Sequence, residues 1–76
     1  MKTLKISLTL AEKVKDFVNI VSRHPFEIDL RCGRFVIDAK SLLGIFSLDL
    51  SKPLTLEAHS EDCEELFKEL EKFAVK

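Results

Sequence analysis

The chain has 76 residues, and its 12 Lys and Arg residues nearly balance 13 Asp and Glu residues, so the formal net charge is −1. Near-neutrality argues against binding to nucleic acid or to an anionic membrane, because both need a clustered basic field. No apolar stretch approaches the ~20 residues that span a bilayer, and 2 cysteines are too few for a disulfide scaffold. These features predict one domain over residues 1–76 that is cytoplasmic and has no cofactor.

The N-terminal segment predicts a strand followed by a helix. Leu4–Leu8 alternates apolar with polar residues, as in a strand with one buried face. Thr9 stands three residues before Glu12, which predicts a capping box and a helix that begins at Leu10 or Ala11. The apolar positions of this helix form one stripe and are Leu10, Val14, Phe17, Val18 and Val21.

The middle of the chain predicts a hairpin and a short second helix. Residues 26–32 and 35–39 alternate in the same way and are separated by Gly33-Arg34, where glycine in first place favours a type II′ turn. Ser41 is a good N-cap for the short helix that follows. The apolar residues at helical spacing in that helix are Leu42, Ile45 and Phe46. The side chains expected on the buried face of the hairpin's second strand are Phe35, Ile37 and Ala39.

The C-terminal part predicts a fourth strand over residues 54–58 and a final helix capped by Ser60. This helix opens with acidic residues and carries Lys68, Lys72 and Lys76 in its later turns. The element order is β-α-β-β-α-β-α. Because each strand alternates, only one sheet face is buried, and we expect an α+β open-faced sandwich with three helices on that face. The side chains expected to meet water on the other face are Lys5, Ser7, Glu27, Asp29, Arg31, Thr55 and Glu57.

The segment at the predicted second helix resembles a known family. Residues 39–48 run Ala-Lys-Ser-Leu-Leu-Gly-Ile-Phe-Ser-Leu. Together with the element order, this run resembles HPr, the phosphocarrier family of the sugar phosphotransferase system. Residues 18–23, 28–30 and 54–58 resemble the same family. The resemblance implies a four-stranded antiparallel sheet in the order 1-4-2-3 with all helices on one face.

The resemblance implies two phosphorylation sites, and the first is altered in this chain. The family carries a histidine in a Gly-(Ile/Leu)-His-Ala-Arg-Pro motif after strand one, which accepts phosphate from enzyme I. Here Leu10 stands at the histidine position, Glu12 at the arginine position and Lys13 at the proline position. A leucine has no lone pair to attack a phosphoryl group, and the Glu12 carboxylate repels a phosphate dianion. We therefore expect no phosphotransfer through this site.

The second family site is the serine of the Lys-Ser motif, which is retained here as Ser41. By resemblance, an HPr-type regulatory kinase phosphorylates this serine. A phosphate at a helix N-cap is stabilised by the free N–H groups of the first turn. The resemblance includes a paralogue that lacks the histidine and acts through the serine by binding a LacI-type repressor. Two interpretations stay open, because Ser41 is either a modification site or only a helix cap.

The resemblance also implies a surface for docking protein partners, made from the start of the first helix and the exposed side of the second. The residues at these positions are Leu10, Glu12, Leu42, Leu43 and Phe46. If Leu10 is exposed together with Leu42 or Phe46, they form an apolar patch that soluble monomers rarely keep without a partner. The alternative is that Leu10 extends the buried stripe.

Other candidate residues carry weaker signals. The topology predicts His24 and His59 at the pole opposite Leu10, where neither replaces the family histidine. No third ligand at recognisable spacing supports a metal site. Cys32, between arginines, and Cys63, in an acidic turn, are expected to pack as free thiols.

The hypothesis is an HPr-like protein that lacks histidine phosphocarrier activity and acts as a regulatory or docking module controlled at Ser41, not as an enzyme. The expected partners are proteins: an HPr-type kinase, a LacI-type repressor or phosphotransferase components. The oligomeric state stays open. One alternative is a phosphocarrier that uses another acceptor residue. A second is a small-molecule-binding regulatory module, which requires a ligand-sized pocket.

Overall fold

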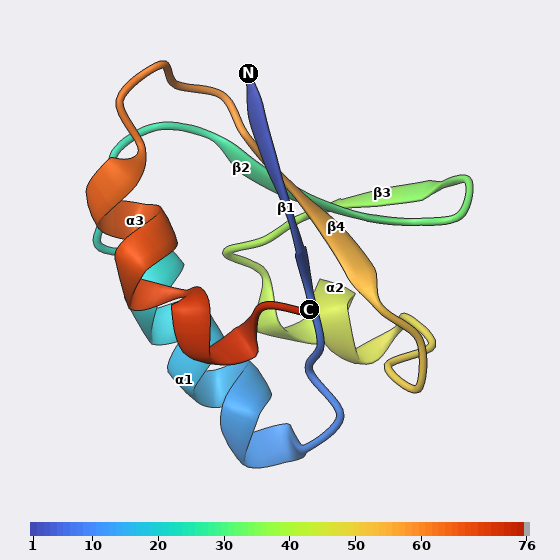
Figure 1. Ribbon diagram of the computed structural model, residues 1–76. Coiled ribbons are helices and arrows are strands. Elements are labelled where there is room, and N and C mark those ends of the chain that lie inside the picture. Colours follow the sequence, from blue (N-terminus) through green and yellow to red (C-terminus); the bar gives the residue numbers. More distant parts are fainter. Residues whose placement is uncertain (76) are drawn as a thin grey trace.

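The structure is a computed structural model that describes residues 1–75 (Figure 1). Its elements are β1 (Lys2–Ile6), α1 (Ala11–Val21), β2 (Ile28–Cys32), β3 (Phe35–Asp38), α2 (Leu42–Phe46), β4 (Leu54–Ala58), α3 (Glu64–Glu69) and the 3-10 turn η1 (Glu71–Phe73). The predicted order of strands and helices is confirmed. Lys76, which the sequence placed in the last helix, lies outside the described residues.

The strands form one antiparallel sheet in the order β1-β4-β2-β3, as the family resemblance implies. β4 and β2 are the central strands, and β1 and β3 are the two edges. Figure 1 shows the three α-helices gathered on one face of this sheet, where α1 packs against both α2 and α3. The opposite face is open. No helix within residues 1–75 is long and apolar enough to cross a membrane.

The core lies between the sheet and the helices, where the apolar half of each alternating strand points. Ile6, Leu30, Leu56 and Phe17 are fully buried. The rings of Phe17 and Phe73 meet edge to face, with their centroids 6.0 Å apart and an interplanar angle of 79°. Burial of each side chain of this size contributes about 1.5–3 kcal/mol. The apolar alternation therefore holds the helices on this face.

The turn between β2 and β3 has the predicted form. Cys32 faces Phe35 across the ladder, which leaves Gly33-Arg34 as a two-residue loop. Gly33 has a φ of +60°, and no other residue within 1–75 has a positive φ. A positive φ at the first loop position alone matches a type II′ turn.

The predicted capping box of α1 is wrong. The N-cap is Leu10, which has extended backbone angles and no side-chain cap hydrogen bond. Leu8 is fully buried and the backbone is still extended at Leu10, so the cap falls one residue later than the box requires. Glu12 is consequently in the first turn of the helix, but its carboxylate does not accept the Thr9 N–H as the box requires.

The predicted cap of the last helix is also wrong. α3 begins at Glu64 after the N-cap Cys63. Ser60 instead closes a local turn, in which its hydroxyl accepts a hydrogen bond from the Asp62 N–H at 3.2 Å. Cys63 is buried, and its insertion into the core sets the residue at which the helix begins.

Leu10, for which the sequence left two alternatives open, is exposed and does not extend the core. Two other side chains lie in environments opposite to those predicted. Phe35 is exposed because α2 has only five residues, which cover Ile37 and stop short of the hairpin tip. Glu57 is buried on the open face, because the Arg31 guanidinium beside it donates to its carboxylate at 3.1 Å and 3.4 Å.

The outer edge of β1 is covered by the end of the chain. The Ser7 N–H donates to the Phe73 carbonyl at 2.9 Å, and the Val75 N–H donates to the Lys5 carbonyl at 3.0 Å. Ile6 and Ala74 form a bridge between these bonds. Within residues 1–75, β3 is therefore the sheet edge without a neighbouring segment.

Candidate docking and phosphorylation site

The start of α1 presents a leucine at the position where the family resemblance implies a phosphate acceptor. The Leu10 carbonyl accepts the N–H groups of Lys13 and Val14 at 3.0 Å and 3.2 Å, which fixes the first helical turn through the backbone alone. The Leu10 side chain is 57% exposed. This end of the helix therefore offers an apolar side chain, and no imidazole, to an approaching molecule.

The charges around this helix start also differ from those of a phosphate site. Glu12 is exposed in the first turn, where its carboxylate complements the helix dipole. It forms no hydrogen bond or ion pair within residues 1–75. A carboxylate in this position competes with an incoming anion for the same free N–H groups. The local field thus favours the helix and opposes phosphate.

Ser41 caps α2, as the sequence predicts. Its hydroxyl oxygen accepts a hydrogen bond from the Gly44 N–H at 3.1 Å. A side chain at position 44 would place its Cβ 3.1 Å from that hydroxyl oxygen, so glycine makes room for the cap. The Lys40 ammonium donates to the carbonyls of His24 and Phe26 at 2.6 Å and 3.0 Å. Lys40 therefore holds the loop between α1 and β2, and its charge is directed away from the Ser41 cap.

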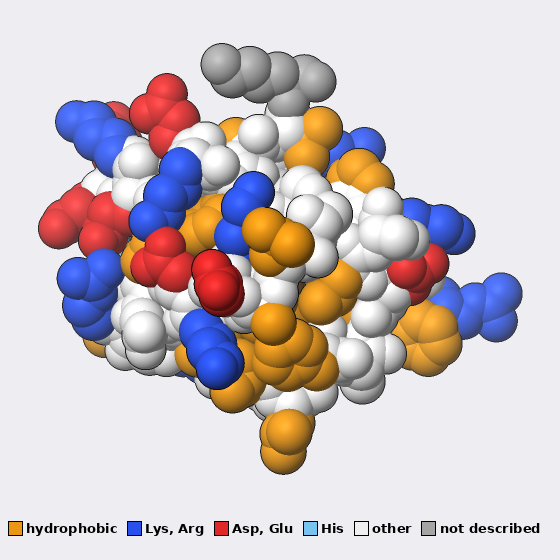
Figure 2. Space-filling view, turned by 90° about the horizontal axis from the view of Figure 1, so that it is seen from below, with side chains coloured by type: hydrophobic (Ala, Val, Ile, Leu, Met, Phe, Trp, Pro, Cys, Tyr) orange, Lys and Arg blue, Asp and Glu red, His pale blue; other side chains and the backbone are white. Residues whose placement is uncertain are grey.

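An exposed apolar surface lies beside these two helix starts. We define it as the α1–α2 surface, formed by Leu10, Leu42, Leu43 and Phe46. Leu43 is 84% exposed and Phe46 is 43% exposed, whereas Ile45 of the same helix is fully buried. Figure 2 views this end of the molecule and shows hydrophobic side chains gathered into a patch. The sequence predicted an apolar patch if Leu10 is exposed together with Leu42 or Phe46, and all three are exposed.

The two histidines lie elsewhere and are each bonded to a carboxylate. His24 follows α1, and its Nε2 lies 2.8 Å from Glu69. His59 follows β4, and its Nε2 lies 2.8 Å from Asp29. Because β4 is antiparallel to β1, His59 lies near the N-terminal end of β1, whereas Leu10 follows its C-terminal end. His24 lies at the opposite end of α1 from Leu10. No cluster of three metal-binding side chains occurs among the described residues.

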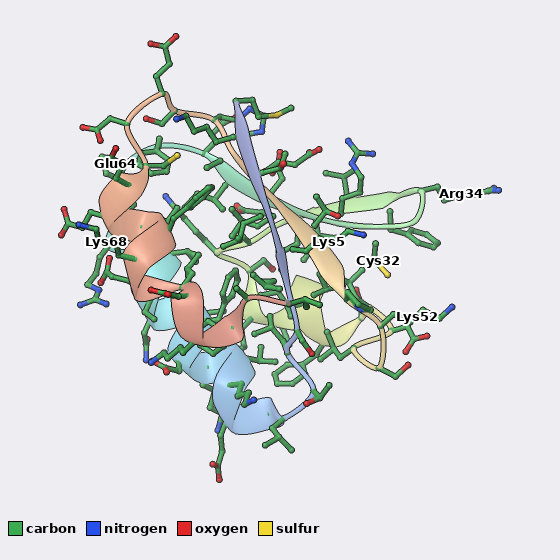
Figure 3. The ribbon with its side chains drawn as sticks, viewed as in Figure 1. Lys5, Cys32, Arg34, Lys52, Glu64 and Lys68 are labelled. Atoms are coloured by element: carbon green, nitrogen blue, oxygen red, sulfur yellow. The ribbon has the colours of Figure 1, made fainter. Side chains whose placement is uncertain are left out.

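The cysteines are free, and neither belongs to the α1–α2 surface. Cys63 is buried, with its thiol 3.8 Å from the Ser60 carbonyl. Cys32 is half-buried in an open groove of about 700 Å³ between the β2–β3 hairpin and the loop after α2. Figure 3 shows Cys32 and Lys52 at this groove. Its size meets the requirement of the small-molecule alternative. Periodicity does not predict it, because its walls come from distant segments.

One carboxylate at the groove has a shifted pKa. The Ser51 hydroxyl donates to Asp49 at 2.6 Å and the Ser51 backbone N–H donates to the same oxygen at 3.1 Å. These bonds favour the ionised form and lower the pKa of Asp49. The nearby Lys52 charge acts in the same direction. Asp49 is therefore an anion held in a local turn.

Comparison with known proteins places this architecture in the phosphotransferase system. A family model described as "PTS HPr component phosphorylation site" matches residues 10–75. The chain therefore belongs to the HPr family. The match begins at Leu10, the residue at the start of α1. No curated protein sequence gives a match.

Two crystal structures of HPr proteins are similar to this fold. HPr-C-His from Thermoanaerobacter tengcongensis is 29% identical, with a TM-score of 0.79 over 95% of this chain and 89% of that chain. A phosphocarrier protein HPr from Bacillus anthracis str. Ames is 25% identical, with a TM-score of 0.72 over 97% of this chain and 94% of that chain. The family resemblance inferred from residues 39–48 is confirmed.

Proposed function

We propose that this HPr-family chain does not carry phosphate at the start of α1 and acts as a protein-docking module through the α1–α2 surface. The observation that carries the proposal is the exposure of Leu10 together with the side chains of α2. Each leucine that a partner buries fully contributes about 1.5–3 kcal/mol. An apolar patch of this kind is kept on a soluble protein where a partner covers it.

The chemistry at Leu10 supports the loss of carrier activity. Phosphoryl transfer needs a nucleophile with an available lone pair, and an alkyl side chain has none. Glu12 adds a negative charge in the first turn of the same helix. The partner is therefore recognised by surface contact, and the chain acts as a binding protein and not as an enzyme. Phosphotransferase components and a LacI-type repressor are the partners that the family resemblance favours.

Ser41 is the proposed control point of this docking. The Lys-Ser-Leu-Leu-Gly run of residues 40–44 is retained, and Ser41 adjoins Leu42 and Leu43 of the docking surface. A phosphoserine adds close to two negative charges at neutral pH. Phosphorylation by an HPr-type kinase would therefore place a dianion at the border of an apolar patch and change which partners bind.

A second candidate function is phosphate transfer through another residue, and His59 is the residue that favours it. Its side chain is partly exposed, and Asp29 bonds its Nε2, which leaves Nδ1 free. A carboxylate bonded to one ring nitrogen holds the imidazole in a fixed orientation. His59 lies far along the sheet from Leu10, however, and the family partners dock at the α1–α2 end.

Incubation of the chain with enzyme I and labelled phosphoenolpyruvate separates the two functions. We expect no label on the chain. An acid-labile, alkali-stable label that maps to His24 or His59 would establish the carrier alternative. A label on His59 would be lost in a His59→Gln variant, and a label on His24 would be lost in a His24→Gln variant. An intact family HPr in the same reaction controls for active enzyme I.

The docking surface is tested by exchanging one exposed apolar side chain for a charge. Leu43→Asp is expected to weaken binding of enzyme I, of an HPr-type kinase or of a LacI-type repressor by at least about tenfold, because it removes about 1.5 kcal/mol or more of apolar contact. Phe35→Asp is the matched control, since Phe35 is also exposed but belongs to the far hairpin. Equal effects of both substitutions would contradict the proposed surface.

A further inference from the structure

The edge of β3 has backbone groups that no part of the described chain uses. The Ala39 N–H donates to the Ile28 carbonyl at 2.9 Å, so Ala39 and Ile28 form a hydrogen-bonded pair of the β2–β3 ladder. Hydrogen-bonded and non-bonded pairs alternate along an antiparallel ladder. Ile37 and Phe35 therefore point their polar groups toward β2, and Val36 and Asp38 point theirs outward. The outward groups available for pairing are both groups of Val36 and the Asp38 N–H.

Although β3 is short and carries Asp38, its edge lacks several of the features that usually prevent pairing with another strand. Protective edges carry lysine, proline, a bulge or a covering segment. Residues 35–38 contain neither lysine nor proline, and the covering segment of this molecule lies on β1 instead. Phe35 is 65% exposed and Val36 is 45% exposed, one on each face of the sheet. The edge therefore combines free hydrogen-bonding groups with apolar side chains.

The charges on the open face show what kind of strand fits. Asp38, Asp29 and Glu57 lie in one row across β3, β2 and β4. Arg31 pairs with Glu57, and His59 pairs with Asp29. Asp38 has no cation within residues 1–75, and its carboxylate accepts only the Lys40 backbone N–H. Like charges directly across a ladder destabilise it. A positive charge from a neighbouring strand beside Asp38 would therefore stabilise this end of the row.

The complementary charge stands at the other end of the same strand. Arg34 forms no ion pair among the described residues. Figure 3 shows its side chain extending away from the body of the molecule at the hairpin tip. Along this edge the side chain of Arg34 is positive, that of Val36 is apolar and that of Asp38 is negative. Arg34 and Asp38 are each two residues from Val36. Two copies of this strand in antiparallel orientation would therefore place opposite charges beside each other.

We propose that the β3 edges of two copies of this chain pair antiparallel about a two-fold axis at Val36, joining two four-stranded sheets into one. In this register Val36 faces Val36 of the second copy and exchanges two hydrogen bonds with it. Arg34 of each copy faces Asp38 of the other. Phe35 faces Ile37 of the second copy on the helix-bearing side, which covers the exposed phenylalanine.

Other registers that use the same outward groups bring like charges together. Pairing Val36 with Asp38 of the second copy places Arg34 opposite Lys40. Pairing Asp38 with itself places two carboxylates opposite each other. Each such pair is destabilising, whereas opposite charges contribute about 0.2–1 kcal/mol per pair. The charge pattern therefore selects the register centred on Val36.

The association is expected to be weak, because a short strand buries less surface than a standard interface of about 1,600 Å². We expect a dissociation constant on the order of 100 µM. Sedimentation equilibrium of the chain from about 10 µM to about 1 mM is the measurement that spans this value. A chain that stays monomeric across that range overturns the proposal.

Charge reversal at the two ends provides the decisive test. Arg34→Asp and Asp38→Arg are each expected to weaken self-association at least about tenfold, because two attractive pairs become repulsive in each variant. When the two variants are mixed, every new charge faces an opposite one, so dimers form again with the wild-type dissociation constant. Misfolding cannot produce this recovery. Failure of the mixture to dimerise, or unchanged dimers in either variant alone, overturns the register.

Two further variants separate this edge from the docking surface. Val36→Pro removes an N–H that the β2 ladder does not use, so the monomer keeps its fold and loses self-association. Leu43→Asp alters only the α1–α2 surface and is expected to leave self-association unchanged. Loss of dimers in Leu43→Asp with dimers retained in Val36→Pro would assign the contact to the α1–α2 surface and refute the β3 interface.

Discussion

Replacing Leu10 by histidine tests whether one side chain accounts for the proposed loss of carrier chemistry. The N-cap geometry depends on the Leu10 carbonyl and not on its side chain. Leu10 is 57% exposed, so less than half of the ~1.5–3 kcal/mol for a buried leucine is at stake. Leu10→His is therefore expected to cost about 1 kcal/mol or less in folding free energy. The variant stays folded, and its chemistry can be measured directly.

The rate of phosphate uptake depends on Glu12 as well. Glu12 is exposed in the first turn, and repulsion between its carboxylate and a phosphate at that helix start is on the order of 1 kcal/mol in this screened setting. Reversal of the charge by Glu12→Arg changes the barrier by about 2 kcal/mol, or about thirtyfold in rate. We expect slow labelling of Leu10→His and about thirtyfold faster labelling of Leu10→His/Glu12→Arg.

The assay is incubation with enzyme I and labelled phosphoenolpyruvate, with the label located by mass spectrometry. Wild-type chain and the single variant Glu12→Arg are the controls and are expected to stay unlabelled. No label on a folded Leu10→His/Glu12→Arg variant would refute the reasoning that the missing imidazole and the added carboxylate account for the loss. Equal rates for the single and double histidine variants would refute the role given to Glu12.

Three further predictions concern Ser41, the open face and the groove. Ser41→Ala is expected to lower the free energy of unfolding by about 1 kcal/mol through loss of the cap, which for a chain of this size lowers Tm by about 4–8 °C, and to abolish slow phosphorylation by an HPr-type kinase. Arg31→Met is expected to lower the free energy of unfolding by about 1–2 kcal/mol because it strips the buried Glu57 carboxylate of its partner, with the exposure of Arg31 limiting the effect. Ser51→Ala is expected to raise the pKa of Asp49 toward its ordinary value, as an NMR titration measures.

Each of these predictions has a matched control. Ser41→Asp keeps a cap acceptor and should retain stability, so equal melting of Ser41→Ala and wild type would contradict the cap. Mass spectrometry is applied after incubation with an HPr-type kinase, both to wild type and to Glu12→Arg, which replaces the carboxylate in the first turn of α1. Finding no phosphate on Ser41 in either protein would leave this serine as a cap only. Adding Glu57→Gln to Arg31→Met should recover most of the lost free energy.

The lowered pKa of Asp49 also determines how the free energy of unfolding changes with pH. A carboxyl group whose pKa is lower in the folded state stabilises the fold above its unfolded pKa, and this stabilisation is lost as pH falls through the folded value. For Asp49 the loss occurs below its ordinary pKa of 3.8. The free energies of unfolding of wild type and Ser51→Ala should therefore change with pH in the same way above about pH 4 and differently below it. A difference in the free energy of unfolding between wild type and Ser51→Ala that stays constant as the pH falls below about 4 would contradict the assignment.

The elements, their order and the family were predictable from the residues alone. Alternating residues in the four strands have a period of two, and the fold that buries one face of each strand follows from that pattern. The Ser41 cap and the Gly33 turn were predictable because both depend on residues within a few positions of each other. The run at residues 39–48 carried the resemblance that the family match confirms.

The residues at which helices begin, and the apolar side chains that face water, depend on packing between distant segments. The caps predicted at Thr9 and Ser60 were wrong because burial of Leu8 and Cys63 sets the backbone path at those points. Exposure of Phe35 follows from the short reach of α2 over the hairpin.

The surfaces on which the proposals rest depend on contacts between distant segments. Leu10 and the side chains of α2 form one patch because α1 and α2 pack against each other. The β3 edge is open because the end of the chain pairs with β1 and leaves the other side of the sheet uncovered. Local periodicity carries no information on either arrangement, since each is set by which elements meet across the core.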